Sequence, residues 1–397
     1  MALKTLKDVD LKFKRVLLRV DFNVPLDKET GEIQDNTRIV AAMNTIYDIL
    51  DGGVTELVIM THLGRPKGEK VPTLSTKVLA EELSNIMGEE VLHVSDCVGI
   101  PCKSQDHRVF MLENVRFHPE EKKGDEGFAK KLAEHGDVFI NDAFAVCHRD
   151  EASVTTVAKV MQAEGKAIAA GRLVEKEAEM LGKILENPKA PFVMIVSGAK
   201  VDTKIGMIQN FYDKVDTFIL GGGIANTFLA AEGFDVADSL YEEDKVELAR
   251  EILVACSEHV NEVVIPTDAM VASEFSATAE AAHVPVEDVM GDMRILDLGS
   301  NTIDRCVEIL SNAEMIVWNG PLGVYEFPQF MEGTKRIAEA IAANKNATTV
   351  IGGGDTVDAV NKLGISFKEY THVSTGGGAM VEFLEGKVLP GIEVLMD

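Results

Sequence analysis

The sequence predicts an α/β fold with two doubly wound, Rossmann-like parallel-sheet domains, joined by a helix and separated by an open interdomain cleft. Two observations support this prediction. Short apolar runs recur along the 397 residues, and each is followed at once by a polar or glycine-rich turn and then by a helix-like stretch. Such alternation is typical of buried parallel strands in βα units. The length also allows roughly two to three domains.

The apolar runs form two series. They cover residues 16–18, 57–60, 109–112 and 138–140 in the first half, and residues 192–196, 218–220, 263–265, 316–318 and 348–351 in the second. Open parallel sheets bind ligands just beyond the carboxyl ends of their strands. The turns after these runs are therefore where we expect functional residues.

Residues 172–187 separate the two series and read as one helix. Leu173, Leu181, Ile184 and Leu185 form an apolar stripe, and Pro188 follows the end. We expect a first domain of residues 1–170, an interdomain helix of residues 171–187 and a second domain of residues 188–379. Because the turns are rich in arginine before this helix and in glycine and lysine after it, the domains should bind different ligands.

The charge balance constrains the partners. Lys plus Arg is 39 and Asp plus Glu is 65, so the formal net charge is −26. Such a surface repels nucleic acid and anionic membrane, and we expect neither as a partner. It also repels phosphorylated metabolites unless basic residues cluster locally.

The cysteine pattern indicates a reducing compartment. The five cysteines are an odd number and include no Cys-x-x-Cys pair, which argues against a disulfide framework and against a zinc site. The first residues lack an apolar signal core, and no apolar run approaches the roughly 20 residues that cross a bilayer. We expect a soluble, cytoplasmic protein.

A basic set in the first half suggests an anion pocket. Arg65, Arg116 and Arg149 follow predicted strands, and a guanidinium fork matches phosphate and carboxylate. The alternative is that each arginine is a solvated surface residue. The turns of this half together carry Asp21, Asn23, Arg38, His62, Arg65, Arg116 and Arg149.

Lysine and glycine dominate the turns of the second half. Lys200 and Lys204 are four residues apart, so they would share a face if a helix starts there and meet phosphates at its amino terminus. A salt-bridged surface turn is an equal alternative. Glycine triplets lie at residues 221–223, 352–354 and 376–378, and any one of them is usually only a turn. The triplet before Asp355 and Thr356 is the stronger candidate, with Asp355 on Mg²⁺ and Thr356 capping the next helix.

Two motifs are absent. The sequence contains no G-x-x-x-x-G-K-[ST], so it is not a P-loop enzyme, and no G-x-G-x-x-G at a first strand–helix turn, so a nicotinamide dehydrogenase loses its main support. The histidines do not space as metal ligands. A nucleotide-binding module without catalysis remains the other alternative.

At these residues the chain resembles the phosphoglycerate kinase family from end to end. The matching strings are residues 19–25 (RVDFNVP), 62–66 (HLGRP), 113–117 (ENVRF), 198–201 (GAKV), 318–321 (WNGP), 352–356 (GGGDT) and 374–378 (STGGG). The resemblance implies a monomeric glycolytic transferase that moves the acyl phosphate of 1,3-bisphosphoglycerate to Mg-ADP, giving 3-phosphoglycerate and ATP. It also implies hinge closure, with the helix at residues 172–187 as part of the hinge, and a tail at residues 380–397 that packs on the first domain.

The resemblance assigns the residues as follows. Arg38 and Lys200 face the transferred phosphoryl group, Glu326 contacts the ribose, and Asp355 holds the metal. Phosphoglycerate is expected at Asp21, Phe22, Asn23, Arg38, His62, Leu63, Gly64, Arg65, Arg116 and Arg149. The nucleotide is expected at Lys204, Gly221, Asn319, Glu326, Gly353, Gly354, Asp355 and Thr356.

One departure from the family pattern concerns the anion site. Where the family usually has a second histidine after Arg149, this sequence has Glu151. A carboxylate beside an anion site opposes binding unless it turns away or pairs with an arginine. We expect weaker phosphoglycerate binding than in a relative that carries the histidine.

Overall fold

The computed structural model describes residues 2–397 and divides them into two compact units. Unit 1 contains residues 2–180 and 388–397, and unit 2 contains residues 181–387. The division falls inside helix α6 (Arg172–Glu186), whose start and end match the helix expected from the apolar stripe to within one residue. Of the expected tail, residues 388–397 belong to unit 1, and residues 380–387 belong to unit 2.

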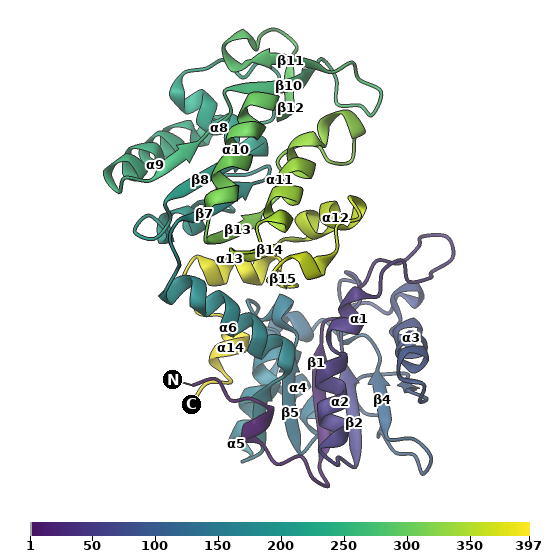
Figure 1. The fold of residues 1–397 in the computed structure, drawn as a ribbon. Helices are drawn as coiled ribbons and strands as arrows, with labels where there is room; N and C mark the ends of the chain where they lie inside the picture. Colours follow the sequence, from purple (N-terminus) through teal and green to yellow (C-terminus); the bar gives the residue numbers. More distant parts are fainter. Residues whose placement is uncertain (1) are drawn as a thin grey trace. The chain divides into compact units, whose positions relative to one another are not determined.

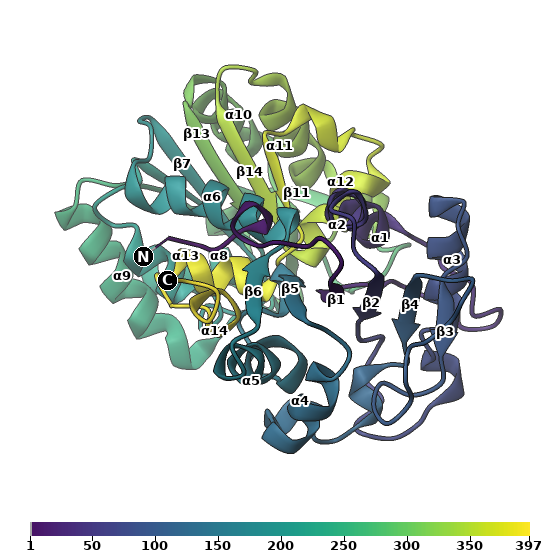
Figure 2. The same cartoon turned by 90° about the horizontal axis from the view of Figure 1, so that it is seen from below.

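Unit 1 is built on a six-stranded parallel sheet in the order β3-β4-β2-β1-β5-β6 (Figure 2). Leu17 of β1 pairs with Val58 of β2 and Phe139 of β5, which fixes the register at the centre of the sheet. The strands are β1 (Arg15–Val20), β2 (Glu56–Met60), β3 (Leu92–Val94), β4 (Val109–Leu112), β5 (Val138–Asp142) and β6 (Ala167–Ala170).

Helices cover both faces of this sheet (Figure 2). They are α1 (Thr37–Ala41), α2 (Met43–Asp51), α3 (Lys77–Met87), α4 (Glu126–Ala133), α5 (Val157–Ala163) and the short α14 (Pro390–Glu393). Val16 and Leu18 of β1 are fully buried and share a core cluster with Ile46 and Ile49 of α2. Strands buried on both faces account for the continuous apolar runs in the sequence.

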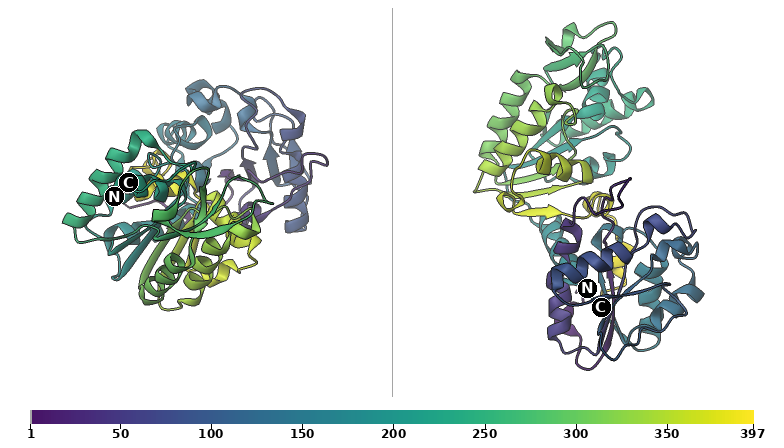
Figure 3. Two further views of the ribbon diagram at one scale, coloured as in Figure 1. Left: turned by 90° about the horizontal axis from the view of Figure 1, so that it is seen from above. Right: turned by 90° about the vertical axis from the view of Figure 1, so that its right-hand side faces the viewer.

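The two ends of the chain lie side by side (Figures 1 and 3). Leu3 and Met396 form an antiparallel bridge, and the Lys4 N–H donates to the Leu395 carbonyl at 3.0 Å. Farther along, the Gly391 N–H donates to the Cys147 carbonyl at 2.9 Å. The last ten residues are therefore an integral part of unit 1.

Unit 2 repeats the scheme with a parallel sheet in the order β15-β14-β13-β7-β8-β9. Its strands are β7 (Phe192–Ser197), β8 (Thr217–Gly221), β9 (Glu262–Val264), β13 (Met315–Asn319), β14 (Thr348–Gly352) and β15 (His372–Ser374). A separate three-stranded antiparallel sheet contains β10 (Asp268–Ala272), β11 (Ala282–Pro285) and β12 (Arg294–Leu298).

The helices of unit 2 also lie on both sides of its parallel sheet, with α10 and α11 opposite α8 and α9 (Figure 1). Ile303, Ile337 and Val360 share one core cluster with the strand residues Ile195 and Trp318. The helices are α7 (Ile205–Asn210), α8 (Gly222–Glu232), α9 (Val246–Glu258), α10 (Ser300–Asn312), α11 (Glu332–Ala343), α12 (Gly354–Lys362) and α13 (Gly378–Leu384).

The expectation of two parallel α/β domains is confirmed. The antiparallel sheet was not anticipated, and neither were the short strands β3, β6 and β15. Within residues 2–397, no helix is both long enough and apolar enough to span a bilayer.

Candidate functional site

The polar residues expected in the first half gather at one edge of the unit 1 sheet. Strands β4, β2, β1 and β5 are consecutive neighbours and parallel, so their carboxyl ends meet. Asp21 follows β1, His62 follows β2, Arg116 follows β4, and Arg149 follows β5. The strand order thus brings together residues that are up to 128 positions apart in the sequence.

Asp21 anchors one side of this cluster. Its carboxylate pairs with the Arg38 guanidinium and lies 3.8 Å from Nδ1 of His62. The neighbouring turn is held by hydrogen bonds from backbone N–H groups to side chains: the Phe22 N–H donates to Thr61 Oγ1 at 3.0 Å, and the Gly64 N–H donates to Asn23 Oδ1 at 2.7 Å. These bonds tie the turn after β1 to the turn after β2.

His62 is buried and stays neutral. Burial lowers its pKa well below the ordinary value, and the positive charges of Arg19, Arg116, Arg38 and Arg149 lower it further. The imidazole is therefore a neutral hydrogen-bonding group within a cationic pocket at physiological pH. Four guanidinium charges thus act on one imidazole.

Arg19 is a member of this cluster that motif reading did not single out. It is fully buried at the end of β1, and its Nη2 lies 3.2 Å from Nδ1 of His62. Its Nε donates to Ser153 Oγ at 2.8 Å, and Ser153 in turn donates to the buried Glu121 carboxylate at 2.5 Å. Burial raises the pKa of Glu121, while the Arg19 charge opposes the rise. The sequence signal was a charged residue inside an otherwise apolar run.

Glu151 pairs with the two arginines at the far side of the cluster. It is 5% exposed, and its Oε1 lies 3.4 Å from both Arg116 Nη2 and Arg149 Nη1. Burial lowers the pKa of Arg116, and Glu151 opposes this effect. Among residues 2–397, Arg116 Nε has no hydrogen-bond partner although it is buried. A buried donor without a partner is costly, so it indicates a place for an acceptor from a ligand.

Arg65 lies at the surface, whereas Leu63 lies in the core. Arg65 is exposed and follows Gly64, whose φ of 63° is left-handed and whose added Cβ would lie 2.8 Å from Leu74. Leu63 is buried, and its N–H donates to Asn114 Oδ1 at 3.3 Å. The Leu63 side chain is thus part of the core.

Unit 2 contains a cavity of about 940 Å³ at the carboxyl ends of its central strands. Of the residues expected to bind the nucleotide, those that line the cavity are Lys204, Asn319, Glu326, Gly353, Gly354, Asp355 and Thr356, and Lys200 lines it as well. Gly221 is not among the lining residues, whereas Gly222 and Gly223 are. A Cβ on Gly221 would lie 2.7 Å from Ser197 Oγ, so this glycine permits close packing behind the cavity wall.

The two lysines lie in a turn before α7. The helix begins at Ile205, so Lys200 and Lys204 do not share a helix face as the four-residue spacing suggested. Both still line the cavity. Burial lowers the pKa of Lys204 to about 8, and the Asp355 carboxylate opposes this shift.

The glycine triplet at residues 352–354 contributes Gly353 and Gly354 to the lining of the cavity. Gly353 has a φ of 100°, and an added Cβ would lie 3.0 Å from Asn319 Nδ2. Helix α12 then starts at Gly354, with Asp355 in its first turn. The expectation that Thr356 caps this helix is wrong: the N-cap position is Gly353, and Thr356 Oγ1 instead accepts the Gly320 N–H at 2.7 Å. Thr356 therefore ties the turn after β13 to α12.

A comparison with known protein families decides the assignment. The family model described as phosphoglycerate kinase matches residues 6–387. This chain belongs to the phosphoglycerate kinase family. The phosphoglycerate kinases of Pelotomaculum thermopropionicum and Moorella thermoacetica are 46% and 47% identical to it over 402 residues, with all of each chain covered.

Solved structures agree with this assignment. The phosphoglycerate kinase of Coxiella burnetii is 38% identical, with a TM-score of 0.88 and 99% of both chains covered. The enzyme of Pyrococcus horikoshii OT3 is 31% identical, with a TM-score of 0.83 over 99% of this chain and 98% of that one. The resemblance found in the sequence is confirmed, and with it the expectation of a glycolytic kinase.

Proposed function

We propose that this chain catalyses the reversible transfer of the acyl phosphate of 1,3-bisphosphoglycerate to Mg-ADP, giving 3-phosphoglycerate and ATP. The observation that carries the proposal is the pair of complementary sites: a part-buried guanidinium cluster in unit 1 and a glycine-lined cavity with two lysines in unit 2. The first suits a small dianionic acid, and the second suits a polyphosphate. Membership of the phosphoglycerate kinase family supports the same reaction.

The phosphoglycerate is proposed to bind in the unit 1 cluster. Arg116 and Arg149 would take its phosphate, and the unpartnered Arg116 Nε supplies one donor. Neutral His62 donates or accepts a hydrogen bond without adding charge. The remaining proposed contacts are Asp21, Phe22, Asn23, Arg38, Leu63, Gly64 and Arg65, with Phe22 and Leu63 contributing backbone atoms.

The nucleotide is proposed to bind in the unit 2 cavity. Lys204 and the backbone at Gly353 and Gly354 would contact phosphates, and Glu326 would contact the ribose. Asn319 and Thr356 would support that turn, and Gly221 would act through packing. Mg²⁺ prefers oxygen ligands, and the exposed Asp355 carboxylate on the cavity wall fits that preference. When bound, the ion would neutralise phosphate charge.

The chemistry requires no general base. The attacking group is a phosphate oxygen of ADP in one direction and a carboxylate in the other, and a carboxylate of pKa about 4 is ionised at neutral pH. The task of the protein is to align two polyanions and to neutralise the charge that spreads over the transferred group. We assign Lys200 and Arg38 to this task as preorganised donors.

Transfer in line requires both substrates to meet. Because the two sites belong to different units, we propose a hinge motion in which part of α6 takes part and which excludes water from the reacting groups. We further propose a monomeric, cytoplasmic enzyme that binds neither nucleic acid nor membrane. The net charge of −26 supports the proposal that the protein binds neither nucleic acid nor membrane.

Calorimetry tests the assignment of the two ligands to separate sites. We expect Arg149→Met to weaken 3-phosphoglycerate binding at least about tenfold, because a charge-assisted bidentate contact is lost. Mg-ADP binding to the same variant is the internal control and should be unchanged. Equal 3-phosphoglycerate affinity in the variant and the parent protein would overturn the assignment.

A further inference from the structure

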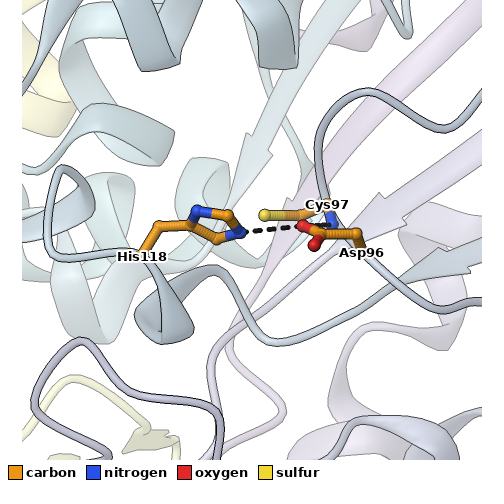
Figure 4. Close-up of side chains that lie close together, drawn as sticks. All are labelled: Asp96, Cys97 and His118. Carbon is orange, nitrogen blue, oxygen red and sulfur yellow. Dashed lines mark hydrogen bonds and ion pairs between the residues drawn. The ribbon is translucent and has the colours of Figure 1, made fainter.

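A second group of ligand-type side chains lies in unit 1 (Figure 4). Asp96, Cys97 and His118 each offer one ligand atom, and these atoms lie within 4.8 Å of one another. Figure 4 shows the His118 ring directed at the Asp96 carboxylate, with the Cys97 sulfur beside them. It is the only such group of three or more His, Cys, Asp or Glu among residues 2–397.

The sheet topology creates this group. Strands β3 and β4 are parallel neighbours, with Val94 paired to Leu112. Asp96 and Cys97 follow β3, and His118 follows the turn after β4, so all three reach the same edge of the sheet. The sequence gives no such signal, because Cys97 and His118 are 21 positions apart and form no known spacing.

We propose that Asp96, Cys97 and His118 form a binding site for one divalent transition-metal ion of the zinc type. Thiolate, imidazole and carboxylate are the three ligand classes that Zn²⁺ takes, with bonds of roughly 2.0–2.3 Å. Those bond lengths place tetrahedral ligand atoms about 3.5 Å apart, so the present spacings, all within 4.8 Å, would have to adjust on binding. The fourth position remains open for water.

The present contacts show how the ligands are held. His118 Nε2 lies 2.8 Å from Asp96 Oδ1, and the Cys97 N–H donates to the same oxygen at 2.8 Å. The other carboxylate oxygen, Oδ2, accepts from Lys70 Nζ at 2.8 Å. A bound metal ion would replace the hydrogen bond between His118 and Asp96. Lys70 would keep its hydrogen bond to Asp96 Oδ2 and orient the carboxylate, as hydrogen-bond partners of ligating carboxylates do. The positive charge of Lys70 reduces the affinity, so we expect an exchangeable site.

Access and electrostatics favour a cation. The Asp96 and His118 side chains are 21% and 23% exposed, so two of the three ligand side chains can meet an ion from solvent, whereas Cys97 is fully buried behind them. Burial raises the pKa of the Cys97 thiol well above its ordinary value, and the charges of Asp96, Glu121 and Glu113 raise it further. The three carboxylates attract a cation, whereas burial by itself opposes ionisation of the thiol. Binding converts the thiol to a thiolate and releases its proton to solvent, so the affinity should rise with pH.

Equilibrium dialysis against ZnCl₂ tests the site. The protein is first stripped with a chelator and kept free of Mg²⁺ and nucleotide. We expect one equivalent of Zn²⁺ in the parent protein, and at least about tenfold weaker binding in Cys97→Ala and His118→Asn. The matched control is Cys256→Ala, a buried cysteine of unit 2, which should bind Zn²⁺ like the parent protein. The parent protein should also gain thermal stability with Zn²⁺.

Substitution by Co²⁺ gives a second readout. A thiolate-to-metal charge-transfer band should appear in the parent protein and in His118→Asn at high Co²⁺, and it should be absent in Cys97→Ala. If Cys97→Ala does not fold, His118→Asn alone decides, because His118 is part-exposed. No bound Zn²⁺ in the parent protein, or equal affinity in His118→Asn, would overturn the proposal.

Discussion

Glu151 Oε1 lies 3.4 Å from Arg116 Nη2, inside a cluster in which guanidinium groups act on a neutral histidine. Of the two ways in which a carboxylate could be tolerated here, turning away or pairing, the structure shows pairing. The same carboxylate also contacts Arg149, so it occupies donors that we assign to the substrate. The substrate must therefore compete with a side chain for its own binding groups.

Replacing Glu151 should strengthen substrate binding. We expect Glu151→His to lower the KM for 3-phosphoglycerate by about three- to tenfold, because one negative charge within a few ångströms of the bound anion is removed. The KM for MgATP should not change. Glu164→Gln, which removes an exposed carboxylate of unit 1, is the control. An unchanged KM for 3-phosphoglycerate in Glu151→His would show that Glu151 does not oppose binding.

Glu151 should stabilise the free protein although it weakens substrate binding. Without substrate, Glu151→Gln leaves the buried Arg116 without its charged partner, and breaking a buried pair costs about 3–5 kcal/mol. We therefore expect a lower thermal midpoint for the free variant and a larger upward shift on adding 3-phosphoglycerate than in the parent protein. Equal midpoints with and without substrate in both proteins would contradict this prediction.

Lys200 is predicted to act on the transferred group. We expect Lys200→Ala to reduce kcat at least about a hundredfold, which corresponds to roughly 3 kcal/mol of lost transition-state stabilisation. The residue is exposed, so the variant should stay folded, as circular dichroism would show. Lys189→Ala, another exposed lysine of unit 2, is the matched control. Near-normal turnover in Lys200→Ala would remove the role assigned to it.

Nucleotide binding should depend on pH through Lys204. Burial lowers its pKa to about 8, so the ammonium is charged at pH about 7 and mostly neutral at pH about 9. The KM for MgATP should rise by up to about tenfold over that range as the charge is lost. Lys204→Arg stays charged throughout and should flatten the profile. If the two proteins give parallel profiles, another group controls the pH dependence.

Asp142 should make the stability of the fold depend on pH in the acidic range. Its Oδ1 accepts the Leu173 N–H at 2.8 Å at the start of α6, and burial raises its pKa from 3.8 to about 6. Since the folded state binds the proton more tightly, this group stabilises the fold below pH about 4, and that contribution is lost as the pH rises through about 6. Asp142→Asn is always neutral, so it should gain up to about 3 kcal/mol relative to the parent protein between pH about 4 and pH about 7. A difference that is constant with pH in urea unfolding would refute this.

The sequence predicted those parts of the fold that depend on long buried strands. Each of the nine apolar runs became a strand because burial on both faces of a parallel sheet demands continuous apolar residues. The strand β3 (Leu92–Val94) contains His93 and is only three residues long, and β15 (His372–Ser374) is as short and begins and ends with polar residues, so neither resembled a buried strand. The antiparallel sheet was not predicted because β11 is largely exposed and so does not resemble a buried strand.

The site residues that belong to recognisable sequence motifs could be predicted. His62, Arg116 and Arg149 follow strands that are recognisable in the sequence, but their convergence depends on the strand order, which the sequence does not state. The buried link from Arg19 through Ser153 to Glu121 joins residues more than 100 positions apart and has no motif. The Thr356 contact with Gly320 was likewise invisible, because a threonine in a first helical turn is indistinguishable from a cap in sequence alone.

The most direct test of the proposed reaction is a coupled assay for ATP-dependent phosphorylation of 3-phosphoglycerate by the purified protein, run beside Lys200→Ala prepared in the same way. We predict robust Mg²⁺-dependent turnover in the parent protein and at least about a hundredfold less in the variant. Absence of turnover in the parent protein, or equal rates in both preparations, would contradict the proposal that this chain transfers a phosphoryl group between nucleotide and phosphoglycerate.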